Sequence, residues 1–140
     1  MTIKPPVIVL IDDDEDDRDM FAIALKTAEP EAKLITASNG PEALKILEAA
    51  GVLPAFIFVD LNMPFMNGIE CLAAIKKLPL IKEVPVVIYT TTSSKEYAEE
   101  TKNGGAAYFL VKPNSLYALS DMLEQILMGV KLDYFLQVKS

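Results

Sequence analysis

Acidic residues gather where the first apolar run of the chain ends. Seven of the eight residues from 12 to 19 are acidic, and they directly follow the apolar run 7–11. We interpret the later acids as residues that favour the positive end of a helix, with the first as its N-cap; these are Asp14, Asp16 and Asp17. Asp12 and Asp13 precede that helix, and their like charges would repel each other unless a cation joined them. The sequence therefore predicts a cation near Asp12 and Asp13.

Three more polar residues end apolar runs in the same way, namely Asp60, Thr90 and Lys112. Each is ordinary by itself, because turn aspartates, capping hydroxyls and lysine–proline turns are common. Together with Asp12 and Asp13 they would place three carboxylates, a hydroxyl and an ammonium around one volume. Carboxylate oxygens suit Mg²⁺, which prefers phosphate oxygens as its remaining partners. Asp60 would then attack phosphorus, while Thr90 and Lys112 stabilise the charge of the transferring group.

The chain alternates between short apolar runs and segments of helical period. The runs span residues 7–11, 33–37, 55–59, 84–89 and 106–111. Because they are apolar on both faces, they are typical of strands in a parallel sheet that helices cover on each side. The alternation predicts one α/β domain with a doubly wound, five-stranded parallel sheet. In such folds ligands bind at the carboxyl edge of the sheet, where the polar residues lie.

Local signals indicate where two helices begin and which one is weakly held. Asn67 with Glu70, and Ser93 with Glu96, have the spacing of capping boxes. The segment 94–103 offers few inward positions, namely Tyr97, Ala98 and Thr101. We therefore expect this helix to exchange conformations easily.

The composition excludes several classes of protein. With 140 residues, 51% of them hydrophobic, the chain fits one compact domain. A net charge of −7 leaves no basic patch, so we expect no nucleic-acid partner. No apolar stretch approaches the roughly 20 residues that span a bilayer, so we expect no membrane partner. With no secretory signal and a single cysteine, Cys71, the protein is expected in the cytoplasm. Histidine is absent, which removes the commonest general base and metal ligand.

Beyond Gly129 apolar and polar residues alternate, a pattern typical of a strand that only Phe135 breaks. The apolar side carries Val130, Leu132, Tyr134, Leu136 and Val138. We expect residues 130–140 to form a C-terminal tail that adds a strand or makes a dimer contact.

Four segments resemble the motifs of one known family. They are IDDDEDD (11–17), VDLNMPFMNG (59–68), TTTSS (90–94) and VKP (111–113). In their order and separations they resemble the receiver domain of bacterial two-component response regulators, in the stand-alone form of the chemotaxis regulator. The resemblance covers residues 5–129 and leaves no room for an output domain. It implies a flavodoxin-like fold with the strand order 2-1-3-4-5.

The resemblance implies roles for the residues around the expected cation. Asp60 resembles the phosphoacceptor. Asp13 and the backbone carbonyl of Asn62 resemble the direct Mg²⁺ ligands beside Asp60, and Asp12 acts mainly through water. Lys112 resembles the cation that binds the phosphoryl group.

Two further positions resemble the switch of the family. Thr90 looks like the switch hydroxyl, and Phe109 falls where the family has its switch aromatic, although Phe109 also fits a plain core position. Phe65 and Met66 depart from the commonest pattern and put apolar bulk at the rim of the site. That bulk either contacts a partner or packs on its own domain.

The resemblance implies a signalling protein rather than an enzyme, with only self-catalysed phosphoryl transfer and dephosphorylation. Its partners would be a histidine kinase or histidine phosphotransfer protein and a downstream protein target. Independently of the resemblance, the alternating tail suggests a second copy of the chain as a partner. The main alternative is a receiver-fold protein that acts as a phosphorylation-independent interaction module. A flavodoxin-like cofactor carrier would need a neutral phosphate cradle where this chain has aspartates. An aspartyl-phosphate hydrolase would need a substrate cap, for which 140 residues leave little room.

Overall fold

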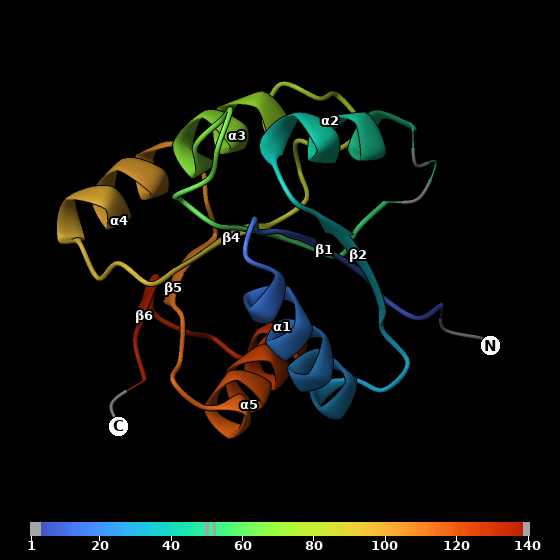
Figure 1. Ribbon diagram of the computed structural model, residues 1–140, viewed down its shortest axis with the longest axis vertical. Helices are drawn as coiled ribbons and strands as arrows, with labels where there is room; N and C mark the ends of the chain where they lie inside the picture. The colour runs from blue at the N-terminus through green and yellow to red at the C-terminus, as the bar shows by residue number, and fades with distance from the viewer. Residues whose placement is uncertain (1–3, 50, 52, 139–140) are drawn as a thin grey trace.

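The computed structural model describes residues 4–49, 51 and 53–138 (Figure 1). The strands are β1 (Val7–Ile11), β2 (Lys33–Ala37), β3 (Phe56–Val59), β4 (Val86–Thr90), β5 (Tyr108–Val111) and β6 (Phe135–Leu136). The helices are α1 (Glu15–Ala28), α2 (Gly40–Ala49), α3 (Gly68–Ile75), α4 (Lys95–Asn103) and α5 (Leu116–Leu127). Strand and helix alternate from β1 to β6, as predicted. Within the described ranges, every helix is too short or too polar to cross a membrane.

The strands form one parallel sheet in the order β2-β1-β3-β4-β5-β6. Helices α1 and α5 cover one face of the sheet, and α2, α3 and α4 cover the other (Figure 1). This arrangement confirms the doubly wound flavodoxin-like fold and the predicted order of the first five strands. The predicted number of five strands is wrong by one, because β6 pairs with β5 along what would otherwise be the edge of the sheet.

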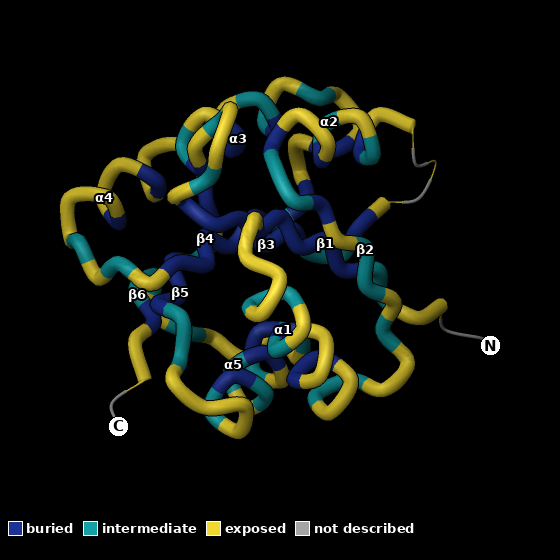
Figure 2. The backbone as a smooth tube through the Cα atoms, in the orientation of Figure 1, coloured by how far each residue is buried: buried dark blue, intermediate teal, exposed yellow. Residues whose placement is uncertain are grey.

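The strands bury both of their faces, in two apolar layers. In β1, Val9 and Ile11 join the layer beneath α2, α3 and α4, whereas Ile8 and Leu10 join the layer beneath α1 and α5. Figure 2 shows the buried strands between helices whose outer surfaces are exposed. Two-sided burial explains why the strands are almost wholly apolar in sequence.

Side-chain caps fix where the helices that border the carboxyl edge of the sheet begin. Asp14 is the N-cap of α1, and its Oδ1 accepts a hydrogen bond from the backbone N–H of Asp17 at 3.0 Å. Asn67 and Glu70 form the predicted capping box at the start of α3, with N···O distances of 2.9 and 3.0 Å. Each cap satisfies backbone donors that the first turn leaves free, so the helices start at defined residues close to the strand ends.

Helix α4 packs on the sheet through a narrow face. Ala98 and Thr101 are buried, whereas Tyr97 is 46% exposed, so the prediction that Tyr97 points inward is wrong. The inward face is centred on the two buried residues, and Tyr97 lies at its border. The capping box predicted at Ser93 is also wrong, because Ser94 caps the helix.

The C-terminal tail completes the sheet. The backbone N–H of Phe109 donates to the carbonyl of Tyr134 at 2.8 Å, and β6 pairs with β5 in parallel. The Phe135 ring stacks on Phe109 with centroids 5.5 Å apart, while Leu136 is buried in the layer beneath α1 and α5. Phe135 breaks the predicted alternation because β6, like the other strands, has apolar neighbours on both faces. The Tyr134 hydroxyl also shares a hydrogen bond of 2.7 Å with Thr101 of α4.

Candidate functional site

Polar side chains meet at the carboxyl edge of the sheet. Asp12 follows β1, Asp60 follows β3, Thr90 ends β4 and Lys112 follows β5. The parallel pairing of these strands brings their ends side by side. Backbone hydrogen bonds hold the ends in register, since Asp60 N donates to Ile11 O at 2.9 Å and Lys112 N donates to Thr90 O at 2.7 Å. The structure thus gathers the residues that the sequence placed at strand ends.

Three carboxylates converge within this edge. Asp12, Asp13 and Asp60 each offer an oxygen atom, and these atoms all lie within 4.8 Å of one another. Asp12 and Asp60 are buried, whereas Asp13 is exposed to solvent. A set of two buried carboxylates and one accessible carboxylate suits a hard divalent cation that keeps part of its water.

Asp12 carries a carboxylate that its surroundings do not fully satisfy. Its Oδ1 accepts a hydrogen bond from the backbone N–H of Asp14 at 3.0 Å. Its Oδ2 is buried and finds no hydrogen-bond partner among the described residues, although the Lys112 ammonium lies 2.9 Å away as an ion pair. Burial raises the pKa of Asp12 to about 6, and the contact with Lys112 offsets only part of that effect. An additional cation at this oxygen would stabilise the ionised form.

Lys112 lies among three carboxylates. Its Nζ is 2.6 Å from Asp17 Oδ2, 2.9 Å from Asp12 Oδ2 and 3.2 Å from Asp60 Oδ2. Burial lowers the pKa of Lys112, but the contacts with Asp17 and Asp12 and the charge of Asp60 outweigh burial and hold the pKa above its ordinary value. The ammonium therefore stays charged beside Asp60.

Asp17 is the member of this group that the sequence analysis missed. The sequence pattern assigns Asp17 to the start of a helix, which it does occupy, and gives no reason to pair it with Lys112. One signal could have found it. Asp17 lies three positions after the cap Asp14, so the two side chains lie on the same side of the helix, near the end of the first strand.

The loop after β3 carries the next predicted residue, Asn62. This residue is exposed and lies two positions beyond Asp60 in the sequence. The loop turns back sharply, and Gly68 N donates to Leu61 O at 2.8 Å. A Cβ at Gly68 would collide with the Asp60 carbonyl oxygen, so glycine lets α3 start directly against the strand end.

Apolar residues at the rim of the site divide into two kinds. Phe65 is 86% exposed and has a φ of 69°, a conformation that aromatic residues rarely adopt. Met66 is partly buried and packs on the apolar layer beneath α2 and α3. Of the two interpretations, packing on its own domain therefore applies to Met66, while Phe65 remains available to a partner.

The two predicted switch residues lie on neighbouring strands. Thr90 is fully buried, and its Oγ1 accepts a hydrogen bond from the backbone N–H of Thr92 at 3.4 Å. Phe109 is fully buried on β5, opposite Ile88, and the Phe135 ring lies against it. A movement at Phe109 would therefore reach the C-terminal tail as well as α4.

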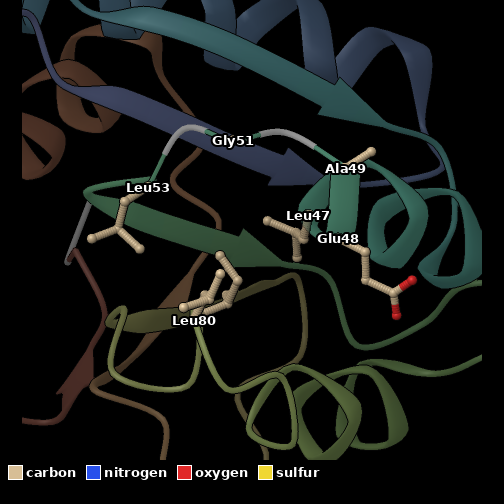
Figure 3. Close-up of a pocket in the computed structure, with 7 residues that line it drawn as sticks. Leu47, Glu48, Ala49, Gly51, Leu53 and Leu80 are labelled. Carbon is tan, nitrogen blue, oxygen red and sulfur yellow. The ribbon is translucent and has the colours of Figure 1, made fainter.

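A hollow of about 500 Å³ lies elsewhere on the molecule, between the end of α2, the segment that precedes β3 and the segment that precedes β4 (Figure 3). Leu47, Leu53 and Leu80 project into it. Its described lining is apolar apart from Glu48 and includes no cationic side chain. This hollow therefore lacks groups that would bind a phosphoryl group, and the acidic cluster remains the candidate site.

Comparisons with known proteins agree with this geometry. The family model described as response regulator receiver domain matches residues 8–124. The response regulator Rcp1 of Synechocystis sp. is 32% identical over 127 residues, which cover 87% of this chain and 86% of Rcp1. Among solved structures, a phosphorylated cyanobacterial phytochrome response regulator, RcpA, superposes with a TM-score of 0.79 at 27% identity, covering 87% of this chain and 91% of RcpA. The Mn²⁺-bound form of Rcp1 superposes with a TM-score of 0.75 at 31% identity, covering 87% and 91% of the two chains.

The chain belongs to the response regulator receiver family, whose members are signalling proteins of two-component systems. Its similarity to Rcp1 and RcpA extends over most of each protein, in both sequence and fold. Receiver domains bind Mg²⁺ or Mn²⁺ at an acidic pocket, and in this chain Asp12, Asp13 and Asp60 form an acidic cluster at the carboxyl edge of the sheet.

Proposed function

We propose that this protein accepts a phosphoryl group on Asp60 from the phosphohistidine of a histidine kinase or histidine phosphotransfer protein. The observation that carries the proposal is the convergence of the Asp60 carboxylate with Asp12, Asp13 and the Lys112 ammonium, which lies 3.2 Å from Asp60 Oδ2. The transfer forms a bond between a carboxylate oxygen of Asp60 and phosphorus, and the bond between phosphorus and the donor nitrogen breaks.

The residues present fit a bound Mg²⁺ ion. Asp13 and Asp60 would supply carboxylate oxygens directly, the backbone carbonyl of Asn62 would be a further ligand, and Asp12 would act mainly through water. The buried Asp12 Oδ2 supports this assignment, because it shares the Lys112 ammonium, 2.9 Å away, with Asp17 and Asp60, and a further cation would stabilise its charge. When bound, Mg²⁺ would neutralise charge shared by the carboxylates and the phosphoryl oxygens.

Protein side chains would stabilise the rest of the transferred group. Lys112 is already charged beside Asp60 and would donate hydrogen bonds to a phosphoryl oxygen. The Thr90 hydroxyl would donate a hydrogen bond to another phosphoryl oxygen. This bond would draw the Thr90 side chain towards Asp60. Such charge-assisted hydrogen bonds contribute about 1.5 to 3 kcal/mol each before any cost of rearrangement.

The movement of Thr90 would signal through Phe109. Phe109 would follow Thr90, and its neighbours on α4 and in the tail would shift with it. The stacking of Phe135 on Phe109 supports a role for residues 130–140 as an interaction segment appended to a receiver unit of residues 5–129. Couplings of about 1 to 3 kcal/mol would shift populations of conformers rather than change the fold.

We propose a downstream protein target as the receiver of this signal, with contact across α4, β5 and the tail. No nucleic-acid or membrane partner is proposed, and a homodimer through the tail stays a prediction that light scattering of the full chain tests. The proposed chemistry consists only of phosphoryl transfer onto Asp60 and hydrolysis of the resulting aspartyl phosphate. We propose that it takes place in the cytoplasm, with a phosphorylated kinase or phosphotransfer protein as the donor.

The test uses a small acyl phosphate as donor. The protein is incubated with acetyl phosphate and Mg²⁺ and its intact mass is measured. We expect the wild type and Asp16→Asn, which changes an exposed carboxylate of the same acidic segment, to gain one phosphoryl group. Asp60→Asn should gain none. An equal gain in Asp60→Asn, or no gain in the wild type, contradicts the proposal and in the second case favours a phosphorylation-independent interaction module.

A further inference from the structure

Asp17 makes the shortest of the three contacts to Lys112. The Asp17 Oδ2 atom lies 2.6 Å from Lys112 Nζ, compared with 2.9 Å for Asp12 and 3.2 Å for Asp60. The Asp17 side chain is 33% exposed, whereas the Lys112 side chain is only 8% exposed. Lys112 is therefore buried with three carboxylates, and its best partner comes from the partly exposed first turn of α1.

The other two partners of Lys112 belong to the acidic cluster. Asp12 and Asp60 are two of the three residues whose oxygens converge for a divalent cation. An ammonium at 2.9 and 3.2 Å from their oxygens competes with such a cation for the same negative charge. Asp17 lies outside that cluster, so it would remain a partner for Lys112 with a cation bound.

The start of α1 holds Asp17 in position for this contact. Its backbone N–H donates to the cap Asp14 Oδ1 at 3.0 Å. The neighbouring Arg18 side chain donates from Nη1 to the Asp12 carbonyl at 2.8 Å. These bonds fix the first turn of α1 to the end of β1. The Asp17 carboxylate is therefore held towards Lys112 by a helix rather than by a flexible loop.

We propose that Asp17 is a positioning residue that gives Lys112 a carboxylate partner outside the cation site, and that it thereby strengthens the binding of Mg²⁺ to Asp12, Asp13 and Asp60. Without Asp17, Lys112 is shared only between Asp12 and Asp60, and Mg²⁺ has to displace it from both. The inference rests on the proposed Mg²⁺ site and adds to it a residue that is not itself a ligand.

The test measures Mg²⁺ affinity directly, by calorimetric titration of the full-length protein at neutral pH. We expect Asp17→Asn to weaken Mg²⁺ binding about tenfold, an effect typical of groups that orient or balance metal ligands. Asp16→Asn removes the same charge from the same turn without touching Lys112, and we expect an effect of less than about twofold from this exposed site. Asp17→Glu keeps the carboxylate and should restore most of the affinity.

A Lys112→Met background separates the proposed action from a simple effect of charge. If Asp17 acts through Lys112, adding Asp17→Asn to Lys112→Met changes Mg²⁺ affinity by less than about twofold, so the two effects are strongly non-additive. An equal tenfold loss in both backgrounds would show that Asp17 acts on the cation by its own charge and would overturn the inference. A wild type that binds no Mg²⁺ refutes the metal site itself, whereas Mg²⁺ binding unaffected by Asp17→Asn refutes only the role of Asp17. Urea denaturation without Mg²⁺ confirms that each variant is folded.

Discussion

Replacing Asp12 by asparagine should increase the stability of the fold and weaken the binding of a cation. Asp12 is fully buried, and burial raises its pKa from 3.8 to about 6. Because the folded-state pKa is the higher one, stability is lost as the pH rises from 3.8 through about 6, and the full cost of ionising Asp12 is present at pH 7. The rise in pKa corresponds to about 3 kcal/mol. Asparagine keeps the acceptor for Asp14 N and carries no charge, but its amide NH2 would face the Lys112 ammonium at the place of Asp12 Oδ2, 2.9 Å away, so it removes only part of this cost.

Urea denaturation without divalent cations measures the effect. At pH 7 we expect Asp12→Asn to raise the free energy of unfolding by about 1 kcal/mol, less than the raised pKa implies because the asparagine amide faces the Lys112 ammonium. The gain should shrink as the pH is lowered from about 6 to below 3.8, where Asp12 becomes protonated in both states. Addition of Mg²⁺ should stabilise the wild type and have little effect on Asp12→Asn. A variant less stable than the wild type at pH 7, or a gain that does not change with pH, would refute the reasoning; Asp16→Asn serves as the control for loss of one charge.

Three further predictions follow from the site and the tail. Mg²⁺ affinity should fall as the pH is lowered through about 6, because Asp12 has to lose its proton to bind the cation, and calorimetric titrations at pH 5 and 7 check this. Leu136→Ala should lower the free energy of unfolding by about 2 to 4 kcal/mol, whereas Val138→Ala, at a residue 39% exposed, should change it by less than about 0.5 kcal/mol in the same urea denaturation. Gly68→Ala should cost about 1 to 3 kcal/mol, because its Cβ meets the backbone of Asp60 and Leu61, and an unchanged denaturation midpoint would contradict that clash.

The sequence indicates both the strands of the sheet and the polar residues at its carboxyl edge, because both follow from the burial of the strands on their two faces. The strands are buried on both faces, so they appear as short apolar runs, and the first polar residue after each run marks the carboxyl edge of the sheet. Asp12, Asp60 and Lys112 all lie at such positions, and the structure brings them together.

Contacts that depend on the rotation of a helix or on distant pairing were not predictable from local patterns. Asp17 and Lys112 are separated by 95 positions, and only the packing of α1 against the sheet turns Asp17 towards Lys112. Tyr97 has a hydrophobic ring yet lies outside, because Ala98 and Thr101 define the packed face of α4. The alternating tail predicted a strand, but its pairing with β5 is a tertiary contact that periodicity does not encode.

The most direct test of the central claim is to locate the phosphoryl group. After phosphorylation with acetyl phosphate and Mg²⁺, borohydride reduction converts a phosphorylated aspartate into homoserine, which peptide mass mapping then places in the sequence. We expect homoserine at position 60, and only in samples that contained Mg²⁺. Homoserine at Asp12 or Asp13 instead of position 60, or modification that is independent of Mg²⁺, would contradict the account.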